Sequence, residues 1–505
     1  MFVTVWSPSS FQPDSRSLPK RNINPEIKPF FHGTLLNEAP RTTVTPKETN
    51  EQDSSSIIRQ VLARYVNQNQ RRVLSVDFTQ NQAADQGNSE VNSDDILNVV
   101  YKKPPFPKKI DLTKLNSRLL NAPAITERRY VFVHGRYWEQ LTMNTRSLIG
   151  LAAQVKSGGR RVVQPMVKDS SFGNEGKPLG TYFDVAHMNK ILAASGYANL
   201  VDKEEYVEEC LLSNASHVTL HFLYNQEKAE VFTKKKFGLS HEEYKKISKM
   251  AKEKGWTECA CLEKFLKLKH GSKQFCVDPT VISDWSILER DVLKGVKCLG
   301  IALWRGVGGG TRTHFSEKHL QIPSKVVQFL LKQSPAVSRE AERFKRTHLS
   351  GRQYIAVQIR GEKVVIRHNL IRLKKCLYLL VNIIQVLKES YGIRKVFLAS
   401  DMSNYGSGSW EYSLRGEIYD NNTLHNIHRD LIARTGAVVY KPAAGQESQD
   451  RGAVSLVEMS LVSQAVHVIT VGSGSFQEWV VAKFLELHRD DSQQLWSLTR
   501  MCLNG

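Results

Sequence analysis

The sequence predicts an α/β protein in which two doubly wound domains face a cleft. Short apolar runs alternate with helical patterns over residues 129–490, which is typical of parallel sheets covered by helices. The chain has 505 residues, which is too long for one ordinary domain and suits two or three. Open α/β sheets bind their ligands beyond the carboxyl ends of the strands, so a site is expected there.

Residues 1–127 are rich in Pro, Asn, Gln, Ser and charged residues, which predicts a disordered, low-complexity tail or stalk with one short helix near 55–70. No apolar run approaches the roughly 20 residues that a membrane span needs. The opening MFVTVWSPSS has too short an apolar core for a signal peptide. Membrane contact is therefore expected only through an anchor that this sequence does not contain.

The first domain is predicted over residues 128–322. Its expected elements are apolar strands and one helix that ends at Gly-Gly: strands 130–135, 160–167, 215–225 and 296–304, and helix 140–159. The lysine-rich segment 226–275 predicts a helical insertion. It could form a nucleic-acid face, but such a run is more often the solvated side of an insertion. The glycines at 306–310 match no phosphate-binding fingerprint and predict a loop.

The second domain is predicted over residues 351–490, after a connecting helix at 323–350 and before a tail at 491–505. Four strand–helix units follow one another there. The strands are expected at 354–360, 395–400, 437–442 and 467–471, and the helices at 370–392, 423–436, 453–465 and 476–489. This regular alternation is typical of a nucleotide-binding sheet.

Charge and cysteine content narrow the function only slightly. The net charge of +20 suits nucleic acid, an anionic membrane surface or a phosphate-bearing ligand. No zinc-finger or RNA-binding pattern supports the nucleic-acid class, so no nucleic-acid partner is expected. The seven cysteines predict ordinary thiols with one or two bridges, although their clustering at 210–276 leaves a lumenal disulfide open. Cys259 and Cys261 lack the spacing of a zinc site.

Polar residues follow each strand of the second domain. They are Arg360, Asp401, Lys441 and the turn Gly472–Phe476. An arginine fork and the backbone N–H groups of a helix start suit a diphosphate, and a carboxylate can accept from the N1–H and amine of guanine. Each residue also has a structural interpretation: Arg360 could pair with an acid, Asp401 could cap a turn, and Ser475 could be an N-cap. Their shared position favours a nucleotide site.

Several short motifs resemble those of the GDP-fucose protein O-fucosyltransferase family, in the family's order over roughly 129–488. They are GRYWEQ (135–140), KPLGTYFDVAHM (177–188), AVQIRGE (356–362), FLASD (397–401) and SLVEMSLVSQAVHVITVGSGSF (455–476). The resemblance implies a GT-B fold and a transferase of carbohydrate metabolism in the lumen of the endoplasmic reticulum or Golgi. It would move fucose from GDP-fucose, with inversion, to a hydroxyl of a protein or glycan.

The resemblance also assigns roles to particular residues. Arg360 matches the arginine that holds the β-phosphate as GDP leaves, so it is the expected catalytic residue. The expected donor-binding residues are Gln358, Arg360, Asp401, Gly474, Ser475, Phe476, Gly135 and Arg136. The chain departs from the family pattern at Gln358, where the family often has His, at Gly474, where it has Ser, and at Glu139, where it has Asn. Glu139 is a hypothetical general base for the acceptor.

The sequence contains no Asp-x-Asp pair, the motif with which other glycosyltransferases hold a metal ion. A cation and helix-terminal N–H groups can stabilise a leaving diphosphate in its place. We therefore expect transfer without metal or cofactor, with GDP-fucose as a substrate. Two alternatives stay open: a GT-B transferase that uses another nucleotide sugar, and a catalytically inactive nucleotide-sugar binder.

Overall fold

The structure is a computed structural model. It describes residues 128–137, 140–213, 215–223, 240–259, 273–282, 284–305, 315, 320, 322–351, 353–367, 369–402, 421–442, 450–488 and 496–503. All of these belong to one compact unit, Asp53–Gly505. The predicted tail at 1–127 and the glycine-rich loop at 306–310 lie outside the described residues.

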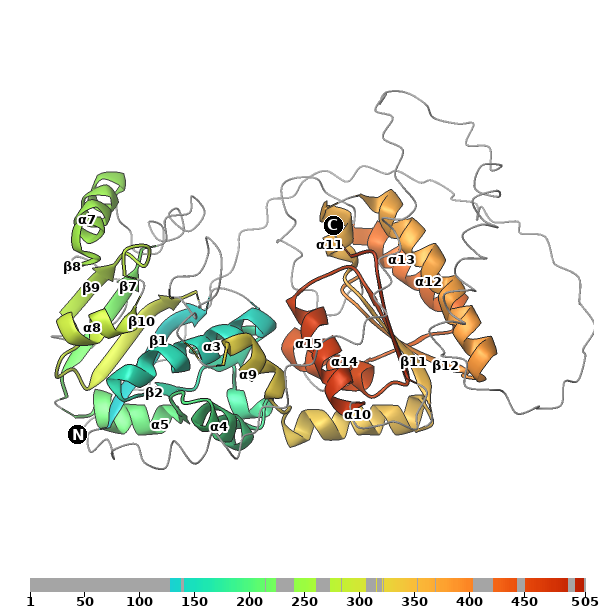
Figure 1. The fold of residues 1–505 in the computed structure, drawn as a ribbon, viewed down its shortest axis with the longest axis horizontal. Coiled ribbons are helices and arrows are strands. Elements are labelled where there is room, and N and C mark those ends of the chain that lie inside the picture. The colour runs from blue at the N-terminus through green and yellow to red at the C-terminus, as the bar shows by residue number, and fades with distance from the viewer. Residues whose placement is uncertain are drawn as a thin grey trace, which may run out of the picture. The chain divides into compact units, whose positions relative to one another are not determined.

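The first half of the described chain is built on a mostly parallel sheet (Figure 1). Its parallel strands lie in the order β6-β2-β1-β10-β7-β9, with bounds β1 Arg129–Tyr137, β2 Arg160–Val163, β6 Leu200–Val201, β7 His217–Phe222, β9 Lys273–Val277 and β10 Cys298–Trp304. Four antiparallel pairings extend it: β8 Trp256–Glu258 pairs with the edge strand β9, and β4 Ser171–Gly173 pairs with the end of β1 and carries β3 Met166–Lys168 and β5 Lys177–Pro178. The chain order reverses between β1 and β10, where ligands of such sheets bind.

The helices of the first half begin at residues that can cap them. Asp184 accepts a hydrogen bond from the His187 amide at the start of α4, and Ser240 and Glu243 form a capping box at the start of α7. The helices are α3 Leu141–Val155, α4 Val185–Ala194, α5 Lys203–Tyr206, α7 His241–Lys254 and α8 Trp285–Asp291, with short 3₁₀ or π turns at Lys156–Gly158, Leu179–Thr181 and Val207–Leu211.

The second half contains a wholly parallel sheet in the order β13-β12-β11-β14-β15. The strands are β11 Tyr354–Ile359, β12 Lys395–Ser400, β13 Val438–Val439, β14 His467–Val471 and β15 Ser497–Met501. In sequence order this is 3-2-1-4-5, the Rossmann arrangement, and its switch point lies between β11 and β14. The predicted class, α/β with two doubly wound sheets, is therefore confirmed.

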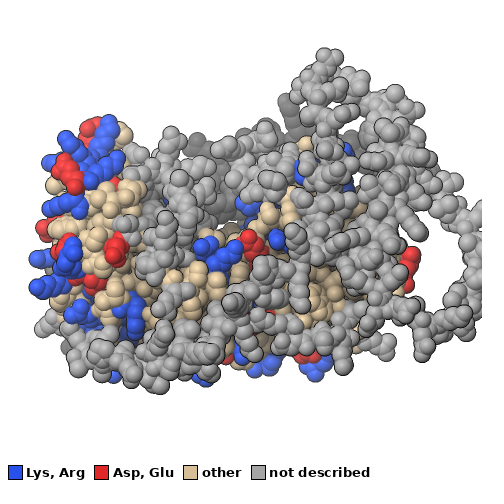
Figure 2. Space-filling view, viewed as in Figure 1, with Lys and Arg blue, Asp and Glu red and all other residues tan. Residues whose placement is uncertain are grey.

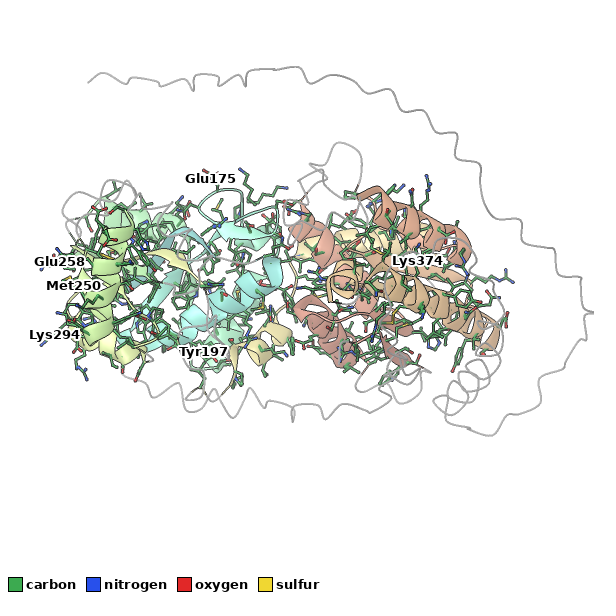
Figure 3. The ribbon with its side chains drawn as sticks, turned by 90° about the horizontal axis from the view of Figure 1, so that it is seen from above. Glu175, Tyr197, Met250, Glu258, Lys294 and Lys374 are labelled. Atoms are coloured by element: carbon green, nitrogen blue, oxygen red, sulfur yellow. A yellow bond between two sulfur atoms is a disulfide. The ribbon has the colours of Figure 1, made fainter. Side chains whose placement is uncertain are left out.

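Helices cover both faces of the second sheet, because alternate residues of its strands are apolar on each face. Helices α12 and α13 pack on the face of Ile355 and Val357, whereas α10, α14 and α15 pack on the face of Tyr354 and Ala356 (Figure 1). The helices here are α10 Pro335–His348, α11 Gly361–Arg367, α12 Leu370–Tyr391, α13 Asn421–Thr435, α14 Arg451–Ser463 and α15 Ser475–Leu487, whereas α9 Ser324–Leu330 packs mainly on α3 of the first half. On α12, Lys374 projects outward while Leu373 and Cys376 are buried (Figure 3).

Four predicted elements differ from the observed ones. The strand expected at 160–167 divides into β2 and β3, since Pro165 lacks the N–H that continued pairing needs. The connecting helix at 323–350 is two helices, because Pro335 starts α10 as its N1 residue with Ser334 as N-cap. The insertion at 226–275 includes β8 and the start of β9 as well as helix α7. Residues expected as a C-terminal tail supply β15.

The charges of α7 bear on the nucleic-acid alternative. Its lysines alternate along the helix with Glu242, Glu243 and Glu253. Figure 2 shows this mixture of signs on the surface of the helix. The described part of the lysine-rich segment is thus a solvated helix face with both signs of charge. In the described part of the chain, no helix is long and apolar enough to cross a membrane.

One large apolar cluster includes residues from both halves. It contains Leu148 and Trp304 of the first half and Ala356 and Leu461 of the second. Aromatic rings from distant segments meet within it, such as Phe222 and Trp304, whose ring centroids are 5.6 Å apart. A smaller cluster lies between the second sheet and α12 and α13. Burial of apolar area in these clusters is the main stabilising contribution to the fold.

Three disulfides join described cysteines, where the sequence analysis expected ordinary thiols with one or two bridges. The pairs are Cys210–Cys298, Cys259–Cys276 and Cys376–Cys502. Their Cα–Cα distances of 5.7, 5.8 and 6.3 Å lie within the range that a disulfide allows. The expectation was wrong because partners up to 126 residues apart in sequence become neighbours only in the fold.

Removing the Cys259–Cys276 disulfide with paired alanine substitutions should destabilise the protein. The disulfide joins cysteines with a sequence separation of 17, and removing a disulfide that closes a loop of that size lowers the free energy of unfolding by about 3 kcal/mol. Urea unfolding followed by tryptophan fluorescence would measure the change. An unchanged urea midpoint would show that this bridge contributes nothing to stability.

Candidate functional site

Arg360 lies at the switch point of the second sheet, directly after β11. Its backbone N–H donates to the Val471 carbonyl at 2.9 Å, which fixes the end of β11 against the end of β14. Its side chain is 31% exposed, and its Nε is 3.7 Å from Oδ2 of Asp401. The guanidinium is therefore held at the carboxyl edge of the sheet while part of it stays open to a ligand.

Asp401 follows β12 and is turned toward Arg360. Its Oδ1 accepts a hydrogen bond from the Gly361 amide at 2.8 Å, and only 11% of its side chain is exposed. Both structural interpretations from the sequence are present, since Asp401 caps a backbone turn and Arg360 pairs with an acid. The carboxylate thus orients Arg360 and the start of α11. The guanine contact expected of Asp401 stays a prediction.

Gly361 is required by close packing, and not by the tight turn that its position suggested. It is the first residue of α11, a helix that the sequence analysis did not expect. A Cβ at Gly361 would lie 2.6 Å from the sulfur of Met402 and 3.5 Å from Oδ1 of Asp401. The absence of a side chain allows the backbone beside Arg360 to approach the end of β12.

Gly361→Ala should lower the free energy of unfolding by about 1–3 kcal/mol, because the new methyl group would displace the buried side chain of Met402. Gly180→Ala is the matched control, since a Cβ there has its nearest neighbour at 3.9 Å, on Val185. Chemical denaturation of both variants measures the difference. Equal stabilities would contradict the close approach at Gly361.

The turn after β14 forms the other side of the switch point. Gly472 has φ of 85°, and a Cβ there would lie 3.1 Å from the Arg360 carbonyl oxygen. Gly474 is the N-cap of α15, and its own Cβ would lie 3.9 Å from Nε of Arg360. Ser475 is exposed at the first position of α15, and Phe476 packs partly into the core. The helix start therefore presents its N–H groups beside Arg360.

Gln358 is buried on the face of the sheet that α14 covers, since it alternates with Tyr354 and Ala356. It is 4% exposed and lies in register with Thr470 of β14, which is fully buried. Among the described residues, neither Gln358 Oε1 nor Thr470 Oγ1 has a hydrogen-bond partner. Two buried polar groups without partners, side by side below Arg360, indicate that this face of the sheet is adapted to a polar ligand or to water.

Glu458 is a residue that the sequence analysis missed. It lies on α14, which packs over β11 and β12, and it is 8% exposed. In the part of the chain that the structure describes, its Oε1 has no hydrogen-bond partner. Burial, together with the nearby charge of Asp401, raises the pKa of Glu458 to about 8. A buried, strongly perturbed carboxyl beside a strand-end site is a functional candidate. Its sequence signal was an acid within the apolar pattern of α14, at a position facing the sheet with Val454 and Leu461.

The first-half residues of the predicted site lie in strand β1. Gly135 and Arg136 were expected in a strand-to-helix turn, but β1 continues to Tyr137, whose ring is buried beside Phe172. Arg136 is exposed and lies in register with Gly173 of β4. Glu139 lies outside the described residues. Sequence reasoning missed Arg305, which is buried directly after β10 at the switch point of the first sheet.

A group of histidines lies below Gly135. His134 of β1 extends over Gly300, where a Cβ would meet its Nε2 at 2.3 Å. Burial, with the neighbouring His217 and His221 of β7, lowers the pKa of His134 to about 3. The imidazole of His134 is thus neutral at physiological pH, which makes it a weak proton acceptor for catalysis.

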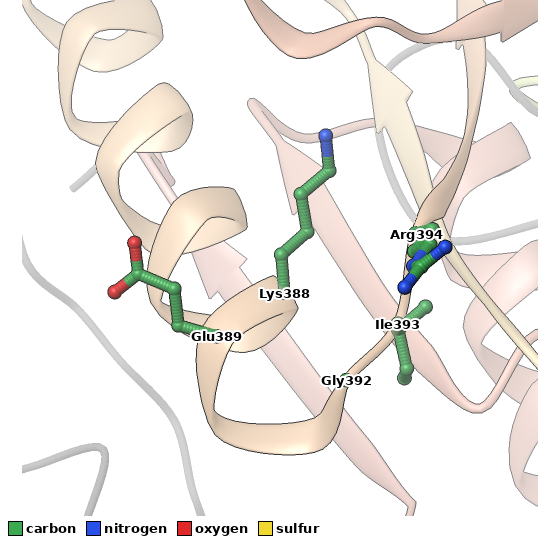
Figure 4. Close-up of a pocket in the computed structure, with 5 residues that line it drawn as sticks. All are labelled: Lys388, Glu389, Gly392, Ile393 and Arg394. Carbon is green, nitrogen blue, oxygen red and sulfur yellow. The ribbon is translucent and has the colours of Figure 1, made fainter. Parts of the chain in front are cut away.

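Two remaining features lie apart from the switch point. Lys441, expected at a strand end, is exposed after the short strand β13 at the edge of the sheet. A pocket lined by Lys388, Glu389, Gly392, Ile393 and Arg394 opens between the end of α12 and the start of β12, at the opposite edge of the sheet from Arg360 (Figure 4). Its Lys388 Nζ donates to the Thr435 carbonyl at 2.7 Å, so it serves a structural contact.

Among the residues that the structure describes, no group of three or more His, Cys, Asp or Glu side chains could hold a metal ion. The expectation of metal-independent transfer stays a prediction. No family model matches the chain, and no curated protein matches its sequence.

Solved structures of two fucosyltransferases match the chain weakly. A crystal structure of POFUT1 in complex with GDP-fucose is 12% identical, with a TM-score of 0.44 over 76% of this chain and 100% of that one. A structure of the fucosyltransferase NodZ from Bradyrhizobium is 14% identical, with a TM-score of 0.32 over 70% of this chain and 93% of that one.

Proposed function

We propose that the chain is a glycosyltransferase that binds GDP-fucose at the carboxyl edge of the second sheet and transfers fucose to a hydroxyl of a protein or glycan. The observation that carries the proposal is the position of Arg360 beside the glycine-lined start of α15, with the buried carboxyl of Glu458 close enough to Asp401, the acid that pairs with Arg360, to feel its charge. A cation, a helix N-terminus and a carboxyl match the diphosphate and the base of a guanine nucleotide.

In this proposal Glu458 takes the guanine contact that the sequence analysis gave to Asp401. Asp401 accepts from the Gly361 amide through Oδ1 and pairs with Arg360 through Oδ2, whereas Glu458 Oε1 has no hydrogen-bond partner among the described residues. A carboxylate accepts two N–H groups from the edge of guanine, and uracil offers only one. Gln358, buried on the same face, can contact the remaining polar atoms of the base.

The leaving diphosphate would be stabilised by Arg360 and by the N–H groups at the start of α15. Breaking the sugar–phosphate bond places negative charge on the diphosphate oxygens, and preoriented cations and N–H groups stabilise that charge most when water is excluded. Inversion at the sugar carbon and independence of metal are parts of this proposal. If EDTA reversibly abolished turnover, the metal-independent form would be wrong.

The acceptor would enter from the first half, where Gly135, Arg136 and Arg305 lie at the strand ends of the sheet. Glu139 remains the hypothetical general base. The disulfides support an oxidising compartment, in agreement with the proposed lumenal location, because such bridges persist there and are rare in the cytosol.

Calorimetric titration with GDP, GDP-fucose and UDP tests the function. We expect GDP and GDP-fucose to bind more tightly than UDP by at least about tenfold, since one lost hydrogen bond to a charged group is worth about 1.5–3 kcal/mol. Arg360→Ala should weaken GDP binding. Arg346→Ala, on the exposed face of α10, should leave it unchanged.

The same titration distinguishes the alternatives. If UDP bound more tightly than GDP, the donor would be another nucleotide sugar and not GDP-fucose. Tight GDP-fucose binding with neither hydrolysis nor transfer would identify an inactive binder. Absence of any nucleotide binding, combined with salt-sensitive RNA binding, would overturn the transferase proposal.

A further inference from the structure

The hairpin between β3 and β4 has an unusual turn. Lys168 pairs with Ser171, and the two residues between them, Asp169 and Ser170, have φ of 46° and 71°. This is a two-residue turn in which both central residues are left-handed, a conformation that favours glycine and asparagine. The turn projects from the first half and is followed by the loop of Glu175, which pairs with Lys168 (Figure 3).

The Asp169 carboxylate contacts the first residue of α14, in the second half. Its Oδ1 accepts from the Arg451 backbone N–H at 3.1 Å and from Arg451 Nε at 2.9 Å, and its Oδ2 accepts from Nη2. Burial would raise the pKa of Asp169, but the hydrogen bonds and charge of Arg451 outweigh it, so the pKa is lowered. The acid also lies at the positive end of the helix, which stabilises it further.

Two further contacts complete the α14 junction, which we define as Asp169, Ser170, Tyr182, Asp450, Arg451 and Gly452. Asp450 is the N-cap of α14 and accepts from the Gly452 and Ala453 amides, while its Oδ2 accepts from the hydroxyl of Tyr182. A Cβ at Gly452 would lie 3.3 Å from the Ser170 backbone. The hairpin and the helix start therefore fit together backbone to backbone.

Nearby contacts join α14 and α15 to α9, to the segment between α9 and α10, and to Phe183. Gln333 Nε2 donates to the Leu456 carbonyl of α14 at 2.8 Å. The ring of Phe183 stacks on Trp479 of α15 at 6.0 Å, and Lys325 pairs with Glu478 at 2.8 Å. The first half thus touches both helices that border the proposed donor site, with the most polar contacts at the start of α14.

We propose that the α14 junction is a latch, that is, a set of contacts that fixes the first half to the helix carrying Glu458. The latch would hold the acceptor and the donor at the distance and orientation that transfer requires. This inference rests on the proposed function for its catalytic consequence. Its residues are positioning residues, because they act through α14. If the latch acts in this way, its loss should reduce transfer to an acceptor and spare the contacts of GDP with Arg360, the start of α15 and Glu458, which all belong to the second half.

Asp169→Asn tests the latch, because it keeps the shape of the side chain and removes its charge. We expect kcat for transfer to fall about tenfold, with GDP affinity and hydrolysis of the donor by water within twofold of the wild type. Asp169→Glu should recover part of the rate. Arg343→Gln is the control, since it removes an exposed ion pair with Glu340 on α10 and should leave every measurement unchanged.

Hydrogen exchange of the full chain tests the latch without relying on the proposed function. In Asp169→Asn, the exchange rates of segments 166–173 and 450–456 should rise together by about tenfold, and in Arg343→Gln they should not. Unchanged exchange in both segments would overturn the latch, whether or not GDP binds. Equal losses of GDP affinity and transfer rate would also overturn it, since they indicate general disruption of the second half.

Discussion

Replacing Arg360 by alanine is expected to lower the rate of fucose transfer by about 10²–10³-fold, the usual cost of removing one donor that stabilises developing charge. The loss should appear mainly in kcat, because the charge on the diphosphate is greatest in the transition state. Arg360→Lys should recover only part of the rate, since an ammonium keeps the charge but lacks the planar fork. Initial-rate kinetics with GDP-fucose measure both variants.

Two controls separate catalysis from folding for Arg360. Arg346→Ala should keep the wild-type rate. Removing the Arg360 side chain also takes a cation away from Asp401, so urea unfolding of Arg360→Ala should accompany the kinetics. A rate within threefold of the wild type in a folded Arg360→Ala protein would rule out its role in leaving-group stabilisation.

Replacing Glu458 by glutamine is expected to change the pH dependence of stability. The pKa of Glu458 is raised by burial, and by the charge of Asp401, from 4.5 to about 8 in the folded protein. Between these pH values the unfolded chain has released this proton and the folded protein has kept it, so the free energy of unfolding falls as pH rises. Glutamine cannot ionise, and the variant should therefore lack this contribution, on the order of 4 kcal/mol over the whole range.

Urea unfolding of wild type and Glu458→Gln at pH 5 and pH 8 measures this effect. The variant should gain stability relative to the wild type as pH rises, and the gain should level off above about pH 8. If the two proteins kept a constant difference across this range, Glu458 would not carry a raised pKa.

The same substitution tests the proposed base contact. If guanine binds the ionised carboxylate, GDP binding must release the proton of Glu458, so affinity should rise with pH up to about 8 in the wild type. Glu458→Gln should bind GDP more weakly and with little pH dependence. It should also lose most of the preference for GDP over UDP. An unchanged preference would remove Glu458 from the base site.

The periodicity of the sequence was sufficient to predict most of the second half. Its buried strands are apolar runs bounded by charged or turn residues, and the prediction therefore placed Arg360 and Gly472 at strand ends. The position of Arg360 beside the start of α15 depends on strand order, because β11 and β14 are neighbours although more than a hundred residues separate them. The resemblance of short motifs pointed to the same edge.

The remaining features depend on contacts that no local pattern reveals. The short helix α11 forms where Asp401 supplies an acceptor for the Gly361 amide, 40 residues away in sequence. The strand β15 was mistaken for a tail because its five residues, SLTRM, are only partly apolar and lie at the edge of the sheet. Glu458 was overlooked because a single acid in a helix usually faces solvent, and only the packing of α14 buries it.

The three described disulfides are divided between the halves, and none of them joins one half to the other. A single proteolytic cut between α9 and α10 would therefore leave two fragments associated only by non-covalent packing. On a non-reducing denaturing gel these fragments should separate without reductant. A cut between Cys259 and Cys276, or one between Cys376 and Cys502, should leave one band until the disulfides are reduced. Electrophoresis of cleaved protein thus shows which segments of this chain are held together by a disulfide.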